Sequence, residues 1–334
     1  MRHVALACAV VLGLTGATAS LQTPSPTGPV PPATRNDRPR DGTEVLVLRH
    51  QQLAKGAHDA YYRSSLDGVW PWYEKIGTRV VGQWLVIDSN GGAGDPGADH
   101  AYRLARYASF EHWRATRDPA NARLGGDGRD RAKSVQAGRD RGGVQTGSQG
   151  AYFLQGITAH TRPLFMPGLA ESLTREDGVA MMSDPIIAMR SDAAQIGGEV
   201  VELRYQQIAK GRFSEFAGHT RDAIWPWEEK LGARPLGQWQ VIYPDAPNRS
   251  KELPEADEVI TLTRYASLAH LAAMAPDRAV LLGGNGPDWK AWRAALDVQR
   301  PLTRSTTVES MRGALYHSPP IYTPTLGERY RSAR

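Results

Sequence analysis

The stretch EVLVLRHQQLAKG at residues 44–56 returns as EVVELRYQQIAKG at residues 199–211. Aligned without a gap, residues 44–87 and 199–242 are identical at 22 of 44 positions. Both copies continue into Trp-Pro-Trp and Gly-Gln-Trp segments, and Arg-Tyr-Ala-Ser at residues 106–109 returns at residues 264–267. Repetition over this length indicates that each half of the chain is one complete structural unit, so the fold is built from two such units.

Each unit carries the pattern of a β-α-β-β-α-β fold. In the first unit, apolar and β-branched residues predict strands over residues 45–50, 79–88, 101–107 and 152–162. Apolar residues at helical spacing predict a helix over residues 54–75. Ser109 is a typical N-cap of a second helix, which a Gly-rich segment at residues 125–128 interrupts. This order is that of a ferredoxin-like unit, so the predicted fold class is α+β with two tandem ferredoxin-like units.

The units are flanked by segments of different composition. Residues 1–20 have the basic start, the apolar run and the Ala-x-Ala site of a signal peptide, so the protein is expected to be exported, periplasmic or secreted, after cleavage near Ser20. Residues 21–42 hold six prolines and predict a disordered tether. The two repeats then span residues 43–168 and 198–326, and residues 169–197 link them.

Composition excludes several classes of protein. Of the 334 residues, 41% are hydrophobic and 22% are charged, which excludes intrinsic disorder of the whole chain. The formal net charge of +5 is spread thinly and the aromatic residues do not alternate with a basic stripe, so no nucleic-acid partner is predicted. The apolar run at the N-terminus is too short for a stable membrane anchor. The only cysteine, Cys8, lies in the signal peptide, so the mature chain has no thiol for a disulfide, a zinc site or an iron–sulfur cluster.

Several short motifs resemble those of a known family. Glu-Val-x-Glu-Leu-Arg at residues 199–204, Gly-x-Trp at 237–239 and Arg-Tyr-x-Ser at 264–267 look like the NIPSNAP family, and Gly-Pro-Asp-Trp at 286–289 is similar to the family's Asp-Pro-x-Trp segment. The first repeat departs from that segment at residues 128–131, and Trp-Pro-Trp is unusual for the family. The family belongs to the dimeric α/β-barrel superfamily. The resemblance therefore implies that the two repeats pair their sheets as a pseudo-dimer within one chain, and it implies little about a reaction; a higher oligomer stays open.

The alternation of side chains along the strands fits the same pairing. In the second repeat, Val201, Leu203 and Tyr205 share one face of the first strand, and Glu202 and Arg204 share the other. We expect the apolar face to pack against the helices, and the polar faces of both repeats to meet and enclose a barrel. A polar cavity between the repeats would then hold a ligand.

Six side chains on the predicted strands are candidates for contacting that ligand. They are Arg49, Arg204, Gln83, Gln238, Tyr107 and Tyr265. An arginine can hold a carboxylate or an oxyanion, a glutamine can orient a ligand, and a tyrosine can donate to a bound oxygen. The alternative is a structural role, because Glu202 can pair with Arg204. The residue equivalent to Glu202 in the first repeat is Val47, so Arg49 is the expected ligand contact and Arg204 the structural member.

Known catalytic patterns are missing from the sequence. The histidines recur as pairs, His112 with His270 and His160 with His317, which favours a structural role over a haem ligand. No His-x-x-x-His, His-Glu-x-x-His or Gly-x-Ser-x-Gly motif is present, so neither a metal centre nor a serine hydrolase is predicted, and no cofactor is expected.

Three functions from different classes stay open. The first is an exported protein that binds a small, partly apolar ligand in the barrel without catalysis. The second is a cofactor-independent monooxygenase-like enzyme that uses the same cavity. The third is a non-catalytic interaction module with a filled barrel. We favour the first, because the matched positions supply no acid–base pair and no nucleophile.

Overall fold

The computed structural model describes residues 45–75, 78–89, 97–107, 109–117, 128–158, 200–231, 233–247, 249–265, 268–275 and 285–315. All of them lie in one unit of the chain, which runs from residue 32 to residue 334. The expected signal peptide, tether and linker, together with His160 and His317, lie outside the described residues. Within the described part, no helix is both long enough and apolar enough to cross a membrane.

Each repeat supplies four strands and a set of short helices. The first repeat contains, in chain order, β1 (Val45–Ala54), α1 (His58–Ser64), η1 (Ser65–Val69), α2 (Trp70–Lys75), β2 (Arg79–Ser89), β3 (Ala98–Tyr107), α3 (Phe110–Ala115), α4 (Gly128–Val144) and β4 (Gln145–Thr158). The second contains β5 (Val200–Ala209), α7 (Phe213–His219), η4 (Thr220–Ile224), α8 (Trp225–Lys230), β6 (Arg234–Ile242), β7 (Ala256–Tyr265), α9 (Leu268–Ala273), α11 (Pro287–Leu302) and β8 (Thr303–Leu315).

Most of these elements lie where the sequence predicts them. The first strand extends to Ala54, so the first helix begins only at His58, and β4 begins at Gln145 instead of residue 152. Ser109 caps α3 as predicted, because its hydroxyl accepts a hydrogen bond of 3.0 Å from the backbone N–H of His112. Residues 118–127 lie outside the described residues, and α4 begins at Gly128 as a helix of its own.

A π-helical turn comes after α1 and after α7, at the same place in the two repeats. In each turn the first residue is a hydroxyl residue that donates to the carbonyl four residues earlier, Ser65 to Tyr61 at 2.8 Å and Thr220 to Phe216 at 3.2 Å. A π-turn widens the helix and rotates the next helical segment about the axis. The indoles that come directly after the turns, Trp70 and Trp225, are buried.

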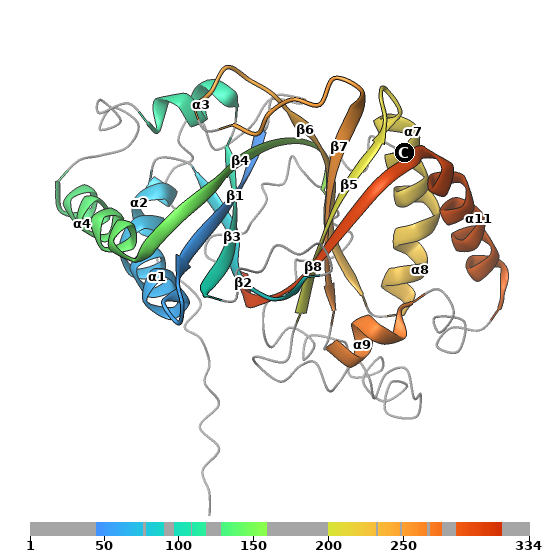
Figure 1. Cartoon of the computed structure of the whole chain (residues 1–334), viewed down its shortest axis with the longest axis horizontal. Helices are drawn as coiled ribbons and strands as arrows, with labels where there is room; N and C mark the ends of the chain where they lie inside the picture. Colours follow the sequence, from blue (N-terminus) through green and yellow to red (C-terminus); the bar gives the residue numbers. More distant parts are fainter. Residues whose placement is uncertain are drawn as a thin grey trace, which may run out of the picture. The chain divides into compact units, whose positions relative to one another are not determined.

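The eight strands form one closed antiparallel barrel in the order β1-β3-β2-β8-β5-β7-β6-β4 (Figure 1). Each repeat contributes four adjacent strands, in the order β4-β1-β3-β2 and β8-β5-β7-β6. The repeats join where β2 pairs with β8 and where β4 pairs with β6. The prediction of an α+β fold is therefore confirmed, and the described strands close a single antiparallel barrel within one chain.

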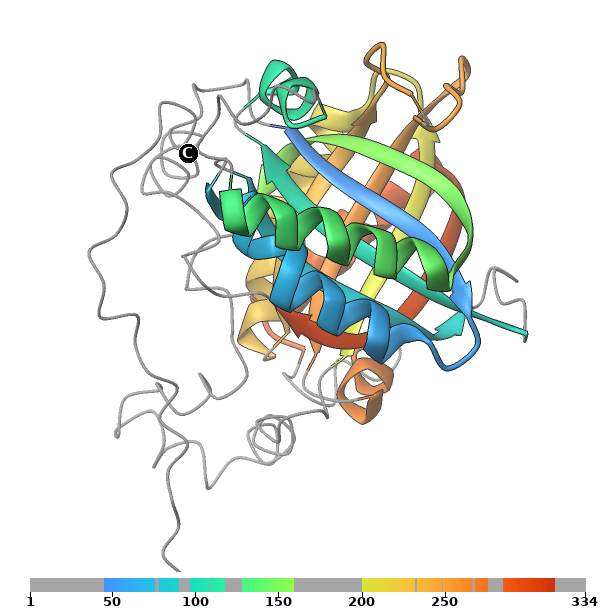
Figure 2. The same ribbon diagram turned by 90° about the vertical axis from the view of Figure 1, so that its left-hand side faces the viewer.

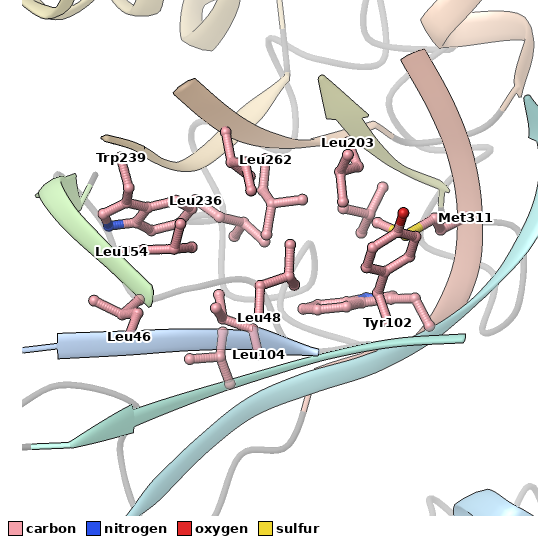
Figure 3. Close-up of a cluster of buried hydrophobic side chains, with 14 of the residues drawn as sticks. Leu46, Leu48, Tyr102, Leu104, Leu154, Leu203, Leu236, Trp239, Leu262 and Met311 are labelled. Atoms are coloured by element: carbon pink, nitrogen blue, oxygen red, sulfur yellow. The ribbon is translucent and has the colours of Figure 1, made fainter. Parts of the chain in front are cut away.

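Most of the sheet face that lines the barrel is apolar, so the expectation of a barrel lined by the polar strand face is wrong. Leucines from β1, β3, β4, β5 and β7 point toward one another in the lumen, together with Trp239 and Met311 (Figure 3). The cluster also includes Trp84, which like Leu48 and Leu104 has no exposed surface. An eight-stranded barrel is just wide enough for its own side chains to fill, and apolar side chains fill most of this one.

The helices cover the outer face of the barrel. α1, α2 and α4 lie outside the strands of the first repeat, and α7, α8 and α11 lie outside those of the second (Figures 1 and 2). On β1, Val45 and Val47 pack with Val69 and Trp70 of the helices, whereas the alternate residues enter the lumen. The next residue on the helix-facing side is Arg49. The polar strand face therefore lies between the sheet and the helices, not inside the barrel.

An isolated first repeat is expected not to form a stable monomer. Its lumen face, with Leu48, Trp84 and Leu104 fully buried in the intact chain, would be open to water. Residues 43–168 expressed alone should therefore form a homodimer or aggregate, as size-exclusion chromatography with light scattering would report. A monomer that unfolds cooperatively at the temperature of the full chain would contradict this.

Candidate functional site

The strands bring three of the sequence-predicted residues together in each repeat. In the first repeat the three are Arg49, Gln83 and Tyr107, and in the second they are the equivalent Arg204, Gln238 and Tyr265. All six lie on the helix-facing side of the sheet, so their expected place in the barrel lumen is corrected. The sheet register explains the grouping in the first repeat, because Arg103 of β3 stands opposite both Arg49 of β1 and Gln83 of β2.

The helices add two side chains that the sequence did not predict. Tyr73 comes from α2, and Arg117 lies two residues after the end of α3. Arg117 Nη2 donates to the hydroxyl of Tyr107 at 3.2 Å, and its Nη1 donates to the hydroxyl of Tyr73 at 3.4 Å. The guanidinium carbon of Arg103 lies 5.7 Å from the centre of the Tyr73 ring. We call Arg49, Tyr73, Arg103, Tyr107 and Arg117 the arginine–tyrosine cluster.

The arginine–tyrosine cluster leads from the interior to the surface. Arg103 is only 3% exposed and Gln83 is fully buried, Arg49 and Tyr73 are half-buried, and Arg117 is exposed. Several buried polar atoms beside it have no hydrogen-bond partner within the described structure: Nε of Arg49, Nε and Nη1 of Arg103, and both amide atoms of Gln83. Buried donors without partners are unfavourable, and a ligand can supply the missing acceptors.

Electrostatics at the cluster reflect three guanidinium groups close together. Burial, with the neighbouring charges of Arg117 and Arg103, lowers the pKa of Arg49 to about 10. Burial alone would raise the pKa of the Tyr73 phenol, but the positive charges of four arginines, with Arg117 and Arg103 foremost, lower it to about 6. The neighbouring guanidinium charges therefore favour the ionised form of the Tyr73 phenol, a form that can act as a counter-charge or as a general base.

At the equivalent position in the second repeat, the charge of the arginine is neutralised by a carboxylate. Arg204 donates to Glu202 at 2.7 Å, and Gln238 donates to the hydroxyl of Thr261 at 3.1 Å. Glu228 stands where the first repeat has Tyr73, and burial raises its pKa to about 8 although Arg204 opposes that shift. The predicted Glu202–Arg204 pair is thus present, and Arg204 has the carboxylate partner that Arg49 lacks among the described side chains.

The paired histidines of the two repeats occupy equivalent places. His112 and His270 are buried at the helix–sheet boundary with their rings against Tyr107 and Tyr265, in keeping with structural roles. Among the described residues, no group of three or more histidine, cysteine, aspartate or glutamate side chains is placed to hold a metal ion.

No family model matches the chain, and no curated protein matches it by sequence. Solved structures similar to it include a candidate monooxygenase from Fusobacterium nucleatum, with 8% identity over 84% of this chain and 97% of that protein and a TM-score of 0.48. A chlorite dismutase variant from Candidatus Nitrospira defluvii matches with 12% identity over 86% and 95% of the two chains and a TM-score of 0.33.

A NIPSNAP family protein of unknown function from Agrobacterium tumefaciens covers 38% of this chain and 96% of its own length, with 18% identity and a TM-score of 0.26. All of these TM-scores are below 0.5, so the fold assignment rests on the strand order and register of this chain.

Proposed function

We propose that the protein binds a small anionic, partly apolar ligand at the arginine–tyrosine cluster of the first repeat. The supporting observation is the contrast between the two repeats. The second repeat neutralises Arg204 with Glu202 and adds Glu228, whereas the first has Val47 and Tyr73 at those positions and adds Arg103 and Arg117. The excess positive charge of the first repeat matches a carboxylate or a phosphate group.

The surroundings of Arg117 favour a ligand that also carries an apolar part. The guanidinium carbon of Arg117 lies 5.4 Å from the centre of the Trp113 ring, and the Phe110 ring stacks on Trp113 at 5.3 Å. Aromatic rings beside an arginine suit an aromatic or aliphatic acid better than a bare inorganic ion.

The proposal also covers the architecture of the chain and its export. The strand order within each half, with helices on the outer face, supports the proposal that each half is a ferredoxin-like unit. We interpret the chain as two tandem NIPSNAP-like units that form a dimeric α/β-barrel pseudo-dimer, exported after cleavage of its signal peptide.

Copying the second repeat into the first tests the proposed ligand site. Thr261 is the equivalent of Arg103, so Arg103→Thr removes a buried charge and places there a residue that the second repeat already accommodates. Calorimetry with phenyl phosphate and with benzoate should show binding to the unaltered protein and at least tenfold weaker binding to the variant, since one charge-assisted contact contributes about 1.5–3 kcal/mol. Added salt should weaken the binding.

Arg212→Met is the matched control, because Arg212 is an exposed arginine on the second repeat that pairs with Glu215. This variant should bind both probes normally. Failure of the unaltered protein to bind either anion, or equal affinity of the Arg103→Thr variant, would refute the proposal. Conversion of a bound acidic probe in air, lost in Tyr73→Phe, would support the second candidate, a monooxygenase-like enzyme in which the Tyr73 phenolate is the base.

A further inference from the structure

One end of the barrel lumen carries polar side chains where the rest is apolar. Tyr152, Tyr205 and Tyr243 are half-buried and pack against the apolar lumen cluster; the first two come from β4 and β5, and Tyr243 directly follows β6. Glu258 of β7 and Glu309 of β8 lie among them and are only 3% and 2% exposed. We call these five residues the barrel mouth. None of them belongs to the arginine–tyrosine cluster, which lies on the opposite face of the sheet.

The strand register places the two carboxylates on the lumen side. Glu309 stands opposite Leu203 in the pairing of β8 with β5, and Leu203 fills the lumen together with Met311. Glu258 alternates with Ile260 and Leu262 along β7, and both of these also belong to the lumen cluster. Two carboxylates therefore face the interior of the barrel near one end.

Glu258 has its partners within the barrel mouth. Its Oε1 accepts a hydrogen bond of 2.5 Å from the Tyr205 hydroxyl, and its Oε2 accepts one from the Tyr243 hydroxyl. Glu258 therefore keeps these two rings in fixed positions at the rim of the lumen.

Only one oxygen of the Glu309 carboxylate has a hydrogen-bond partner among the described residues. Tyr102 forms a hydrogen bond with it, the Tyr102 hydroxyl lies 3.2 Å from Nδ1 of His50, and Nε2 of His50 lies 3.0 Å from Nδ1 of His100. These three side chains orient the carboxylate but leave its Oε2 buried without a partner, and Nε2 of His100 is buried without a partner as well. Within the described part of the chain, no lysine or arginine contributes to the pKa shift of Glu309.

The two carboxylates and the tyrosine rings form a site of negative potential. Burial, and after it the negative charges of Glu258 and Glu309, raise the pKa of Tyr152. The centre of the Tyr152 ring lies 6.1 Å from that of Tyr205. An unpaired buried carboxylate oxygen calls for a hydrogen-bond donor, and tyrosine faces attract cations.

We infer that the barrel mouth binds a small organic ammonium ion. Its N–H groups donate to Oε2 of Glu309, its charge is offset by Glu309 and Glu258, and its apolar part packs on the tyrosine rings. This inference does not depend on the proposed anion site, because it uses other residues and a ligand of opposite charge.

The pairing requires the ionised form of Glu309. Burial raises the pKa of that carboxyl, while Tyr102 and His100 act to lower it. As the pH falls through this raised pKa, Glu309 becomes neutral and ammonium binding should weaken. Burial, with His100 beside it, lowers the pKa of His50 to about 4, so His50 supplies no competing positive charge above that pH. Among the described residues, the titratable side chains of Tyr102 and Tyr152 also face Glu309.

Calorimetry with phenethylammonium, and with neutral 2-phenylethanol of similar shape, tests the inference. The full chain should bind the amine and not the alcohol, with affinity that falls as the pH is lowered through the raised pKa of Glu309, because the protonated carboxyl no longer offsets the ammonium charge. Glu309→Gln keeps an oxygen for Tyr102 and should weaken amine binding at least tenfold. Glu215→Gln, at an exposed carboxylate on α7, is the control and should bind normally.

Variants at each site distinguish the proposed ammonium site from the proposed anion site. Arg103→Thr should bind phenethylammonium as the unaltered protein does, and Glu309→Gln should bind phenyl phosphate as before. The pH dependence in the unaltered protein gives an independent result if Glu309→Gln folds poorly. No binding of the amine, equal binding of the alcohol, or affinity that is the same across the pH range would overturn the inference.

Discussion

Replacing Trp84 by alanine is expected to lower the free energy of unfolding by about 3–5 kcal/mol. Trp84 is fully buried in the lumen of the barrel, and its indole nitrogen has no hydrogen-bond partner in the described structure, so the loss is one of packing alone. A rigid barrel cannot collapse around the empty volume, because backbone hydrogen bonds fix its diameter. Denaturant unfolding followed by circular dichroism measures the effect.

Trp239→Ala is the matched comparison, since Trp239 is the equivalent residue of the second repeat and fills the same lumen. Both variants should show a single transition and similar losses, because each cavity opens in a core shared by the two repeats. Separate transitions for the two halves, or a loss below about 1 kcal/mol in both variants, would show that the halves are stable on their own.

Removing the two equivalent arginines should have opposite effects. Arg204→Met is expected to cost about 1–3 kcal/mol, because it leaves the buried Glu202 carboxylate without its guanidinium donor. The value lies below that of a fully buried pair because the Arg204 side chain is 39% exposed. Arg49→Met strands no carboxylate and removes one of three clustered positive charges, so stability should stay the same or rise.

Thermal unfolding at neutral pH distinguishes the two arginines. Glu202→Gln combined with Arg204→Met should recover part of the loss, since the stranded charge is gone. Arg49→Met should at the same time weaken phenyl phosphate binding. Equal destabilisation by both single substitutions, with binding unchanged, would mean that both arginines serve only the scaffold.

The sequence predicts much of the fold because strand periodicity is a local signal and the repeat can be read by aligning the two halves of the chain. Alternation along β5 shows that Val201 and Leu203 share a face, but it cannot show which face the helices cover. In a barrel wrapped by helices both faces are buried, so an apolar face does not identify itself as the inner or outer one. For this reason the sequence alone leads to the wrong placement of the polar face inside the barrel.

The candidate site is partly visible in the sequence for a related reason. The exchange of Glu202 for Val47 stands in the aligned repeats, and it predicts that Arg49 lacks a neighbouring carboxylate. Arg103 and Arg117 join Arg49 only through strand register and helix packing, which no local pattern encodes. The barrel mouth is visible in the aligned repeats as two positions where side chains of different chemistry replace one another. His50 aligns with Tyr205, and Tyr152 aligns with Glu309.

Closure of the barrel also dictates the order in which the molecule can assemble. The seam between β2 and β8 pairs Gly82 with Leu315, so one of the two joints waits until nearly the whole described chain has been made. Contacts between such distant segments form slowly. Until then the first repeat presents its leucine-lined face uncovered. The closing step, more than the stability of the finished barrel, is therefore expected to govern the yield of folded protein and its dependence on chaperones.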